Sequence, residues 1–292
     1  MILPDYFLKN IEETVGTEYE IIHIDNSKNQ YSIFAAYNQG SARSKYPYLC
    51  FVHEDVKFHT PNWGKKVIEH LQKQKTGIVG LAGGDLASRI PASWSAFMSS
   101  IKIIQADKTG RKPLRYIHHP SDFAEKSRSV ILLDGVLLCM KCELMQKIKF
   151  DEQFDGFHGY DFDISIQSIV AGYTNYVMYD VDLEHFSHGK PDAHYYRNLI
   201  AIFKKWEKYL PLIGKNVTDE QRNHIPEIEE KRLSRLIRLM TRTGFTTDEI
   251  IKESTYFANV IGSEKSTGTY LNQKFRIYFL RLFTCPKYLL IK

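Results

Sequence analysis

The sequence predicts an α/β fold in which helices flank a mainly parallel central sheet. Segments with strand character alternate with segments of helical spacing over residues 1–210, and this alternation is typical of strand–helix–strand units. The apolar run YLCFV at 48–52 is uninterrupted, as in parallel strands that are covered on both faces. Residues 211–292 read instead as polar, amphipathic helices. We therefore expect one α/β domain over 1–210 and a helical extension over 211–292.

The composition is that of an ordinary globular protein. With 292 residues, 43% of them hydrophobic, the chain can bury a full core. Its formal net charge of +5 is modest and its charges are interleaved over most of the length, so no nucleic-acid partner is expected. No segment has the apolar length that crosses a bilayer, the first residues lack the pattern of a signal peptide, and the four cysteines fit a reducing compartment. Together these features predict a cytoplasmic protein.

The first segments predict a helix, a strand and a second helix. Pro4 stands at a helix-opening position and apolar residues recur at helical spacing up to Gly16, which predicts a helix over 4–16. The β-rich run YEIIHID at 19–25 predicts a short strand. Residues 33–45 have the spacing of a second helix.

The next segments continue the alternation and then lose it. After the strand at 48–52, residues 62–74 predict a helix and residues 76–84 predict a strand of small residues that enters a loop. Periodicity is weak over 86–126. A connection of this length without regular structure is more typical of a substrate-covering region than of a tether.

The remaining segments restore the pattern and then become helical. Residues 129–148 predict strands followed by a helix, and residues 160–179 predict a helix, a stop and a strand, with Gly172 at the stop. Residues 193–210 and 219–243 then predict amphipathic helices.

Hydrophilic side chains follow two of the predicted strands at the point where each strand ends. Asp25 and Asn26 close the second segment, and His53, Glu54 and Asp55 follow the apolar run YLCFV. In open parallel sheets, ligands bind beyond the carboxyl ends of the strands. Oxygen ligands of this kind suit Mg²⁺ or Mn²⁺ held against an anionic ligand. The alternative is that these acids only cap a solvated turn.

A second acidic pair opens a predicted helix. Asp161 and Asp163 lie in the segment YDFDIS, where free backbone N–H groups and the helix dipole favour a carboxylate. We expect such a group to be ionised at neutral pH, as a general base must be. A capping role without chemistry is the alternative.

The order of four motifs resembles a known family. FVHEDV, LLDG, FDEQFDGFHGYDFDIS and GYTNYVMYDVDLEHFSHG, taken in this order, resemble the landmarks of family 2 glycosyltransferases with the GT-A fold, over about residues 5–206. In that family an acidic strand-tip motif holds a metal, a later acidic motif supplies the catalytic base, and a histidine often completes the metal site. Only Met1 to Leu3 precede the first predicted helix, so we expect either that the usual first strand of the family is absent here or that another segment fills its place.

The resemblance implies a metal site for Mn²⁺ or Mg²⁺. Asp55 matches the last acid of the strand-tip motif and is the expected ligand, and His53 stands where the family usually has its first Asp. His185 and His188 compete for the C-terminal position, and His185 is favoured because it lies nearer the strand end.

The resemblance also implies the catalytic base and the donor-binding residues. Asp161 matches the base, and Tyr160 replaces the glutamate that usually precedes it. Asp25 and Asn26 match the contacts to the nucleobase or ribose, Glu54 is at the variable middle position of the strand-tip motif, and Asp134 lies on the acceptor and diphosphate side. The expected donor-binding residues are therefore Asp25, Asn26, Asn38, Glu54 and Asp134.

The implied activity is transfer of a sugar from a UDP-, GDP- or dTDP-sugar to a hydroxyl of a glycan or lipid-linked acceptor, with inversion, as in bacterial polysaccharide biosynthesis. One alternative is a non-catalytic GT-A-like protein that binds nucleotide sugars, and another is a nucleotidyltransferase. Basic and aromatic residues interleave in the tail KFRIYFLRLFTCPKYLLIK. The tail is expected either to contact the inner face of the membrane peripherally or to pack as a helix on the protein.

Overall fold

The computed structural model describes residues 3–106, 115–119, 125–186 and 191–263. His188 and the predicted membrane-contacting tail lie outside these ranges. The chain divides into two compact units. The first comprises Met1–Ala87, Ser93–Lys190 and Leu212–Val217, and the second comprises Ser88–Ala92, Pro191–Pro211 and Thr218–Lys292. A domain boundary near residue 210 stays a prediction.

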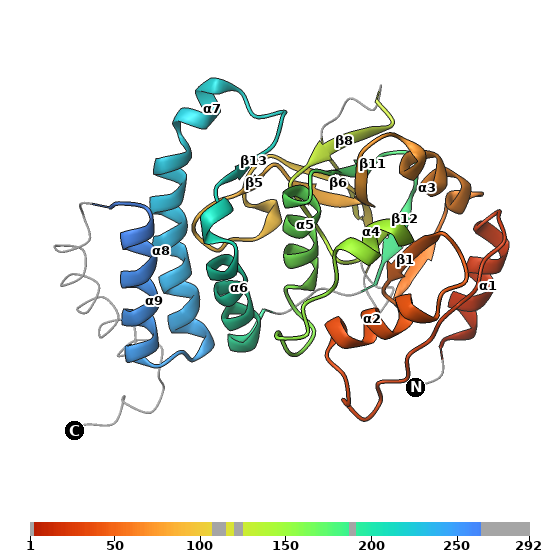
Figure 1. Ribbon diagram of the computed structural model, residues 1–292, viewed down its shortest axis with the longest axis horizontal. Coiled ribbons are helices and arrows are strands. Elements are labelled where there is room, and N and C mark those ends of the chain that lie inside the picture. Colours follow the sequence, from red (N-terminus) through yellow and green to blue (C-terminus); the bar gives the residue numbers. More distant parts are fainter. Residues whose placement is uncertain (1–2, 107–114, 120–124, 187–190, 264–292) are drawn as a thin grey trace. The chain divides into compact units, whose positions relative to one another are not determined.

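The first unit contains two larger sheets with helices around them (Figure 1) and a two-stranded sheet of β5 (Leu86–Ala87) and β13 (Leu212–Ile213). The first sheet has the order β1–β10–β3–β11–β8, formed by Tyr48–Val52, Leu137–Lys141, Thr76–Gly80, Thr174–Met178 and Ser127–Val130. The second has the order β2–β12–β6–β4–β9, formed by Val56–Phe58, Leu183–His185, Ser99–Gln105, Ala82–Gly84 and Leu132–Leu133. The α/β class is therefore confirmed.

The prediction of a mainly parallel sheet is wrong for the described strands. In the first sheet only β11 and β3 pair in parallel, and β10 pairs antiparallel with both β1 and β3. Strands β1 and β3, which a helix separates along the chain, do run in the same direction. β10 lies between them and runs in the opposite direction, so both of its pairings are antiparallel.

Helices cover both faces of the first sheet. They are α1 (Asp5–Thr14), α2 (Ile33–Arg43), α3 (Trp63–Gln72), α4 (Cys142–Lys147) and α5 (Tyr160–Val170). One core joins α1 and α3 to one face of the strands, and the other joins α2, α4 and α5 to the opposite face. Neighbouring residues of one strand, such as Ile78 and Val79, enter different cores. This two-sided burial explains the continuous apolar runs.

Strand β1 departs from that two-sided burial. Cys50 in its centre is exposed, and the first sheet ends at β1, so its outer edge pairs with no described strand. The run at 19–25, predicted as a strand, is not one, because it has no strand neighbour with which to form a ladder. Its side chains Tyr19 and Ile21 are exposed.

The region predicted as irregular contains a strand pair. β6 pairs antiparallel with β7 (Arg115–His119), from Ile101 opposite His119 to Gln105 opposite Arg115. The prediction over 86–126 is wrong there, since the alternation in SSIKIIQ is too short to separate from the polar residues around it.

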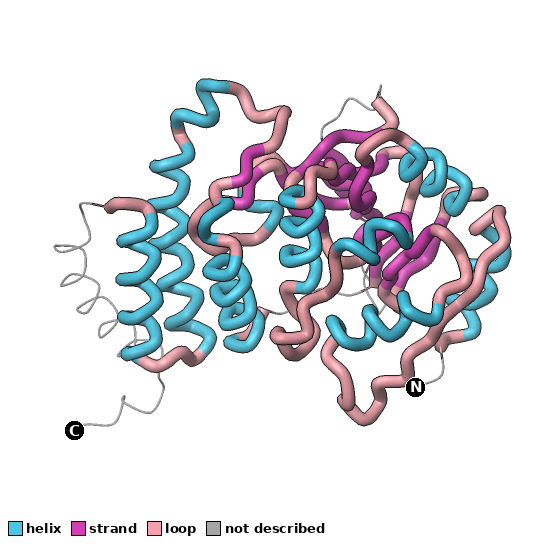
Figure 2. Tube along the Cα trace, viewed as in Figure 1, coloured by secondary structure: helices cyan, strands magenta, loops and turns pink. Residues whose placement is uncertain are grey.

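The second unit is helical among its described residues (Figure 2). It contains α6 (Ala193–Lys205), α7 (Asp219–Asn223), α8 (Ile225–Thr243) and α9 (Thr247–Val260). Gly244 ends α8 with a φ of 91°, and Thr246 opens α9 with a capping box. Apolar residues of α6, α8 and α9 form one core. No helix in the described part of the chain combines the length and apolarity needed to span a membrane.

Candidate functional site

Three predicted metal ligands meet where β1 ends. His53 follows the last residue of β1, Asp55 precedes β2, and His185 is the last residue of β12. β12 pairs with β2 so that His185 lies opposite Val56, and the backbone N–H of Phe186 donates to the carbonyl of Asp55 at 3.0 Å. The register therefore carries His185 to the strand tip, more than a hundred residues along the chain from Asp55.

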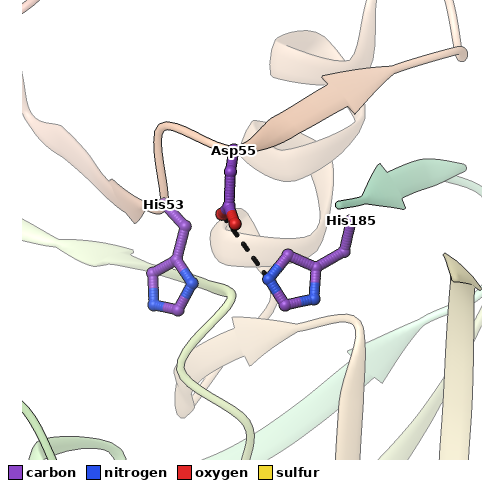
Figure 3. Close-up of side chains that lie close together, drawn as sticks. All are labelled: His53, Asp55 and His185. Atoms are coloured by element: carbon purple, nitrogen blue, oxygen red, sulfur yellow. Dashed lines mark ion pairs between the residues drawn. The ribbon is translucent and has the colours of Figure 1, made fainter. Parts of the chain in front are cut away.

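The three side chains point toward one another (Figure 3). One ligand atom from each lies within 4.8 Å of the others, and His185 Nε2 is 3.6 Å from Asp55 Oδ1. The side chains of His185 and Asp55 are only 15% and 21% exposed. Two imidazoles and a carboxylate in this arrangement fit a divalent transition metal such as Mn²⁺, and three protein ligands leave coordination positions for substrate oxygens.

His53 is in the protonation state that a metal ligand needs. Burial lowers its pKa and the nearby His185 lowers it further, against the opposing effects of Asp134 and Asp55. The ring is therefore neutral at pH 7. Its Nε2 lies 2.9 Å from the hydroxyl of Tyr160, so the side chain of His53 joins the strand tip to the start of α5.

Asp161 lies in the first turn of α5, directly after Tyr160. The helix begins after Gly159, whose φ of 91° favours glycine. The side chain of Asp161 is only partly covered, which leaves it open to a substrate group. Asp163 is fully buried, and the amide of Gln167 donates to its carboxylate at 2.7 Å. Of the two acids, only Asp161 has the exposure that a base requires.

The expectation that Asp161 is ionised at neutral pH is wrong for this structure. Although part of the residue is exposed, the surrounding protein shields its carboxylate from water; this desolvation raises its pKa to about 8, and the charge of Asp134 adds to the shift. Hydrogen bonds from the backbone N–H groups of Phe162 and Gly135 oppose the rise without cancelling it. The local sequence showed the helix N-terminus but gave no sign that a second carboxylate, from the β9–β10 turn, lies beside it.

Asp134 is held in place by two donors. The indole Nε1 of Trp94 donates to its Oδ2 at 2.8 Å, and the backbone N–H of Val136 donates to its Oδ1 at 3.0 Å. Gly135 accepts a hydrogen bond from the Tyr160 hydroxyl at 3.0 Å. The β9–β10 turn therefore contacts both residues at the start of α5.

The other predicted donor-binding residues make different contacts. Asp25 accepts a hydrogen bond from the backbone of Ser27, and Asn26 bonds the backbone of Tyr31 in both directions. The amide of Asn38 bonds both the backbone N–H and the carbonyl of Phe150. Glu54 is exposed at the strand tip. The described contacts do not join Asp25, Asn26 or Asn38 to the metal ligands, so their donor roles stay predictions.

Sequence reasoning missed the roles of Tyr160 and Trp94 at this site. Tyr160 stood out only as a departure from a motif, and its bond to His53 joins residues 107 positions apart. Its place directly before Asp161 at a helix start was the one available signal. Nothing in the sequence around Trp94 indicates Asp134 as its partner.

Comparisons with known proteins add the following. A family described as "Glycosyltransferase like family" matches residues 5–206. None of the curated proteins compared with the chain matches it. Among solved structures, a crystal structure of GalNAc-T7 with UDP, GalNAc and Mn²⁺ is similar, with a TM-score of 0.43 and 12% sequence identity. The similarity covers 78% of this chain and 44% of that one, so this chain spans less than half of the neighbour's length.

Proposed function

We propose that this chain, which belongs to the glycosyltransferase-like family, transfers a sugar from a nucleotide-diphosphate donor to an acceptor hydroxyl with the help of a divalent cation. The observation that supports this most is the linkage between two groups of residues. His53, Asp55 and His185 lie within one ion's reach, and His53 is hydrogen-bonded to the residue that precedes Asp161. This linkage supports a cation site next to a candidate base.

Each group has a distinct proposed task. A cation bound by His53, Asp55 and His185 supplies positive charge that offsets the charge on a departing diphosphate. Asp161 accepts the proton of the attacking hydroxyl, and a base on the face opposite the leaving group implies inversion. The donor is a UDP-, GDP- or dTDP-sugar and the acceptor is a glycan or a lipid-linked sugar. Asp134, beside Asp161, lies on the acceptor side.

The test is a panel of nucleotide sugars assayed with Mn²⁺, with Mg²⁺ and after chelation. Release of nucleoside diphosphate is expected with one donor class in the presence of Mn²⁺, and chelation is expected to reduce it by about 100-fold or more, because a metal supplies several kcal/mol of charge stabilisation. Adding Mn²⁺ back is the control. Donor binding without release of diphosphate, with every acceptor class tried, would favour the non-catalytic alternative.

The pH dependence of sugar transfer measures the pKa of the proposed base. Because the pKa of Asp161 is raised to about 8, the fraction that can accept a proton grows with pH below that value. We expect kcat/KM to rise about tenfold per pH unit below pH 8 and to level off above it. Steady-state rates between pH 5.5 and 9.5, at saturating cation, measure the profile.

The matched variant for this profile is Asp134→Asn. It removes the charge that adds to the raised pKa of Asp161, so the midpoint is expected to move to lower pH. An unchanged midpoint in the variant, or a profile that falls with rising pH in the native protein, would contradict the assignment of Asp161 as base.

A further inference from the structure

We infer that Tyr160 is a positioning residue for the cation site. Its hydroxyl fixes the tautomer of His53, so that Nε2 carries the proton and Nδ1 presents its lone pair to the cation. This inference rests on the proposed function, and it adds a residue that the predicted ligand set did not contain.

The direction of the hydrogen bonds follows from the chemistry of the partners. The Tyr160 hydroxyl lies 3.0 Å from the carbonyl oxygen of Gly135, which can only accept. The single phenolic proton is therefore directed at Gly135. His53 Nε2, at 2.9 Å from the same phenolic oxygen, must then act as the donor. A neutral imidazole with its proton on Nε2 has a bare Nδ1, which is the form that ligates a metal.

The Tyr160 hydroxyl carries a single proton, and that proton is donated to the carbonyl oxygen of Gly135. No proton of Tyr160 is left to donate to His53, so the tautomer of His53 is determined.

Packing around the Tyr160 ring holds its hydroxyl in position for the hydrogen bonds to Gly135 and His53. The side chain of Tyr160 is 4% exposed, and its ring packs edge-on against Phe34 and Tyr37, with centroids 6.3 and 5.4 Å away. Residue 135 must be glycine, because a Cβ there would lie 2.1 Å from the Tyr160 hydroxyl oxygen. The hydroxyl therefore occupies the space that the absence of a side chain at Gly135 leaves beside the β9–β10 turn. Metal-binding histidines commonly depend on such a partner for the ring nitrogen that does not face the metal.

The test is Tyr160→Phe, which keeps the ring and removes the hydroxyl. We expect the Mn²⁺ affinity, measured by calorimetry without donor or acceptor, to fall by about 10- to 100-fold. Tyr37→Phe is the matched control, because it removes a hydroxyl from the same cluster that does not contact His53. Its Mn²⁺ affinity is expected to stay within about threefold of the native value. Thermal unfolding of both metal-free variants shows whether they are folded.

A spectroscopic readout tests the tautomer directly. In ¹⁵N NMR of the metal-free native protein, His53 is expected to show a protonated Nε2 and a bare Nδ1, and Tyr160→Phe is expected to show a mixture. A proton on Nδ1 in the native protein, or native Mn²⁺ affinity in folded Tyr160→Phe, would overturn the inference. If the native protein bound no Mn²⁺, this inference and the cation site would both fail. Intact Mn²⁺ binding without sugar transfer would overturn only the proposed function.

Discussion

Replacing Asp161 with Asn is expected to lower kcat for sugar transfer by about 1,000-fold, because an amide of the same shape cannot accept the hydroxyl proton. A loss of that size corresponds to roughly 4 kcal/mol of transition-state stabilisation. The donor affinity is expected to change little, since Asp161 is separate from the three metal ligands. Initial rates with a true acceptor measure the first effect, and donor titration in the presence of Mn²⁺ measures the second.

Helix α5 offers a matched control for this experiment. Asp163→Asn changes an acid two residues away that is fully buried and bonded to Gln167. We expect it to affect stability and to leave kcat for the folded protein near the native value. If Asp161→Asn kept near-native turnover on a true acceptor, another group would have to be the base.

Removal of Asp55 is expected to have the second large effect. Asp55→Ala removes the one carboxylate of the three-residue cluster and leaves the imidazoles of His53 and His185. Without the anionic ligand, the Mn²⁺ affinity is expected to fall by about 100-fold or more, and Mn²⁺-dependent binding of nucleoside diphosphate is expected to fall with it. Calorimetric titration with Mn²⁺, first alone and then with nucleoside diphosphate, separates the two effects.

Asp182→Ala is the control for this change. Asp182 lies three residues before His185, forms an ion pair with Lys102 at 3.0 Å and is not one of the three clustered residues. Its removal is expected to leave Mn²⁺ binding unaltered. Equal loss of Mn²⁺ affinity in the two variants would indicate a general effect of surface charge, and no loss in Asp55→Ala would place the cation elsewhere.

The sequence predicted the helices of the first unit better than its sheets. Helices such as α1 and α5 carry their own signals, namely apolar spacing and the residues at their ends. An apolar strand such as β1 carries no signal for the direction of its neighbour. The antiparallel insertion of β10 places a later segment of the chain between two earlier strands. The segment at 19–25 failed as a strand for a related reason, since a strand needs a partner that local sequence does not specify.

At the candidate site too, the sequence predicted some features, and others depended on contacts between distant segments. The resemblance identified His53, Asp55 and His185, and the structure brings them together. The error about the charge of Asp161 came first from the burial of its carboxylate and then from a neighbour, Asp134, in another segment. Burial and neighbouring charges of this kind determine pKa values. Both depend on tertiary structure, which the local sequence around a residue does not specify.

The first turn of α5 holds two residues with different proposed roles. Tyr160 and Asp161 are consecutive residues that follow Gly159; the hydroxyl of Tyr160 lies 2.9 Å from His53 Nε2, and Asp161 is the proposed base. A residue other than glycine at position 159 would strain the start of α5 and so would displace both side chains together. Comparison of this position among relatives would show whether glycine is retained there.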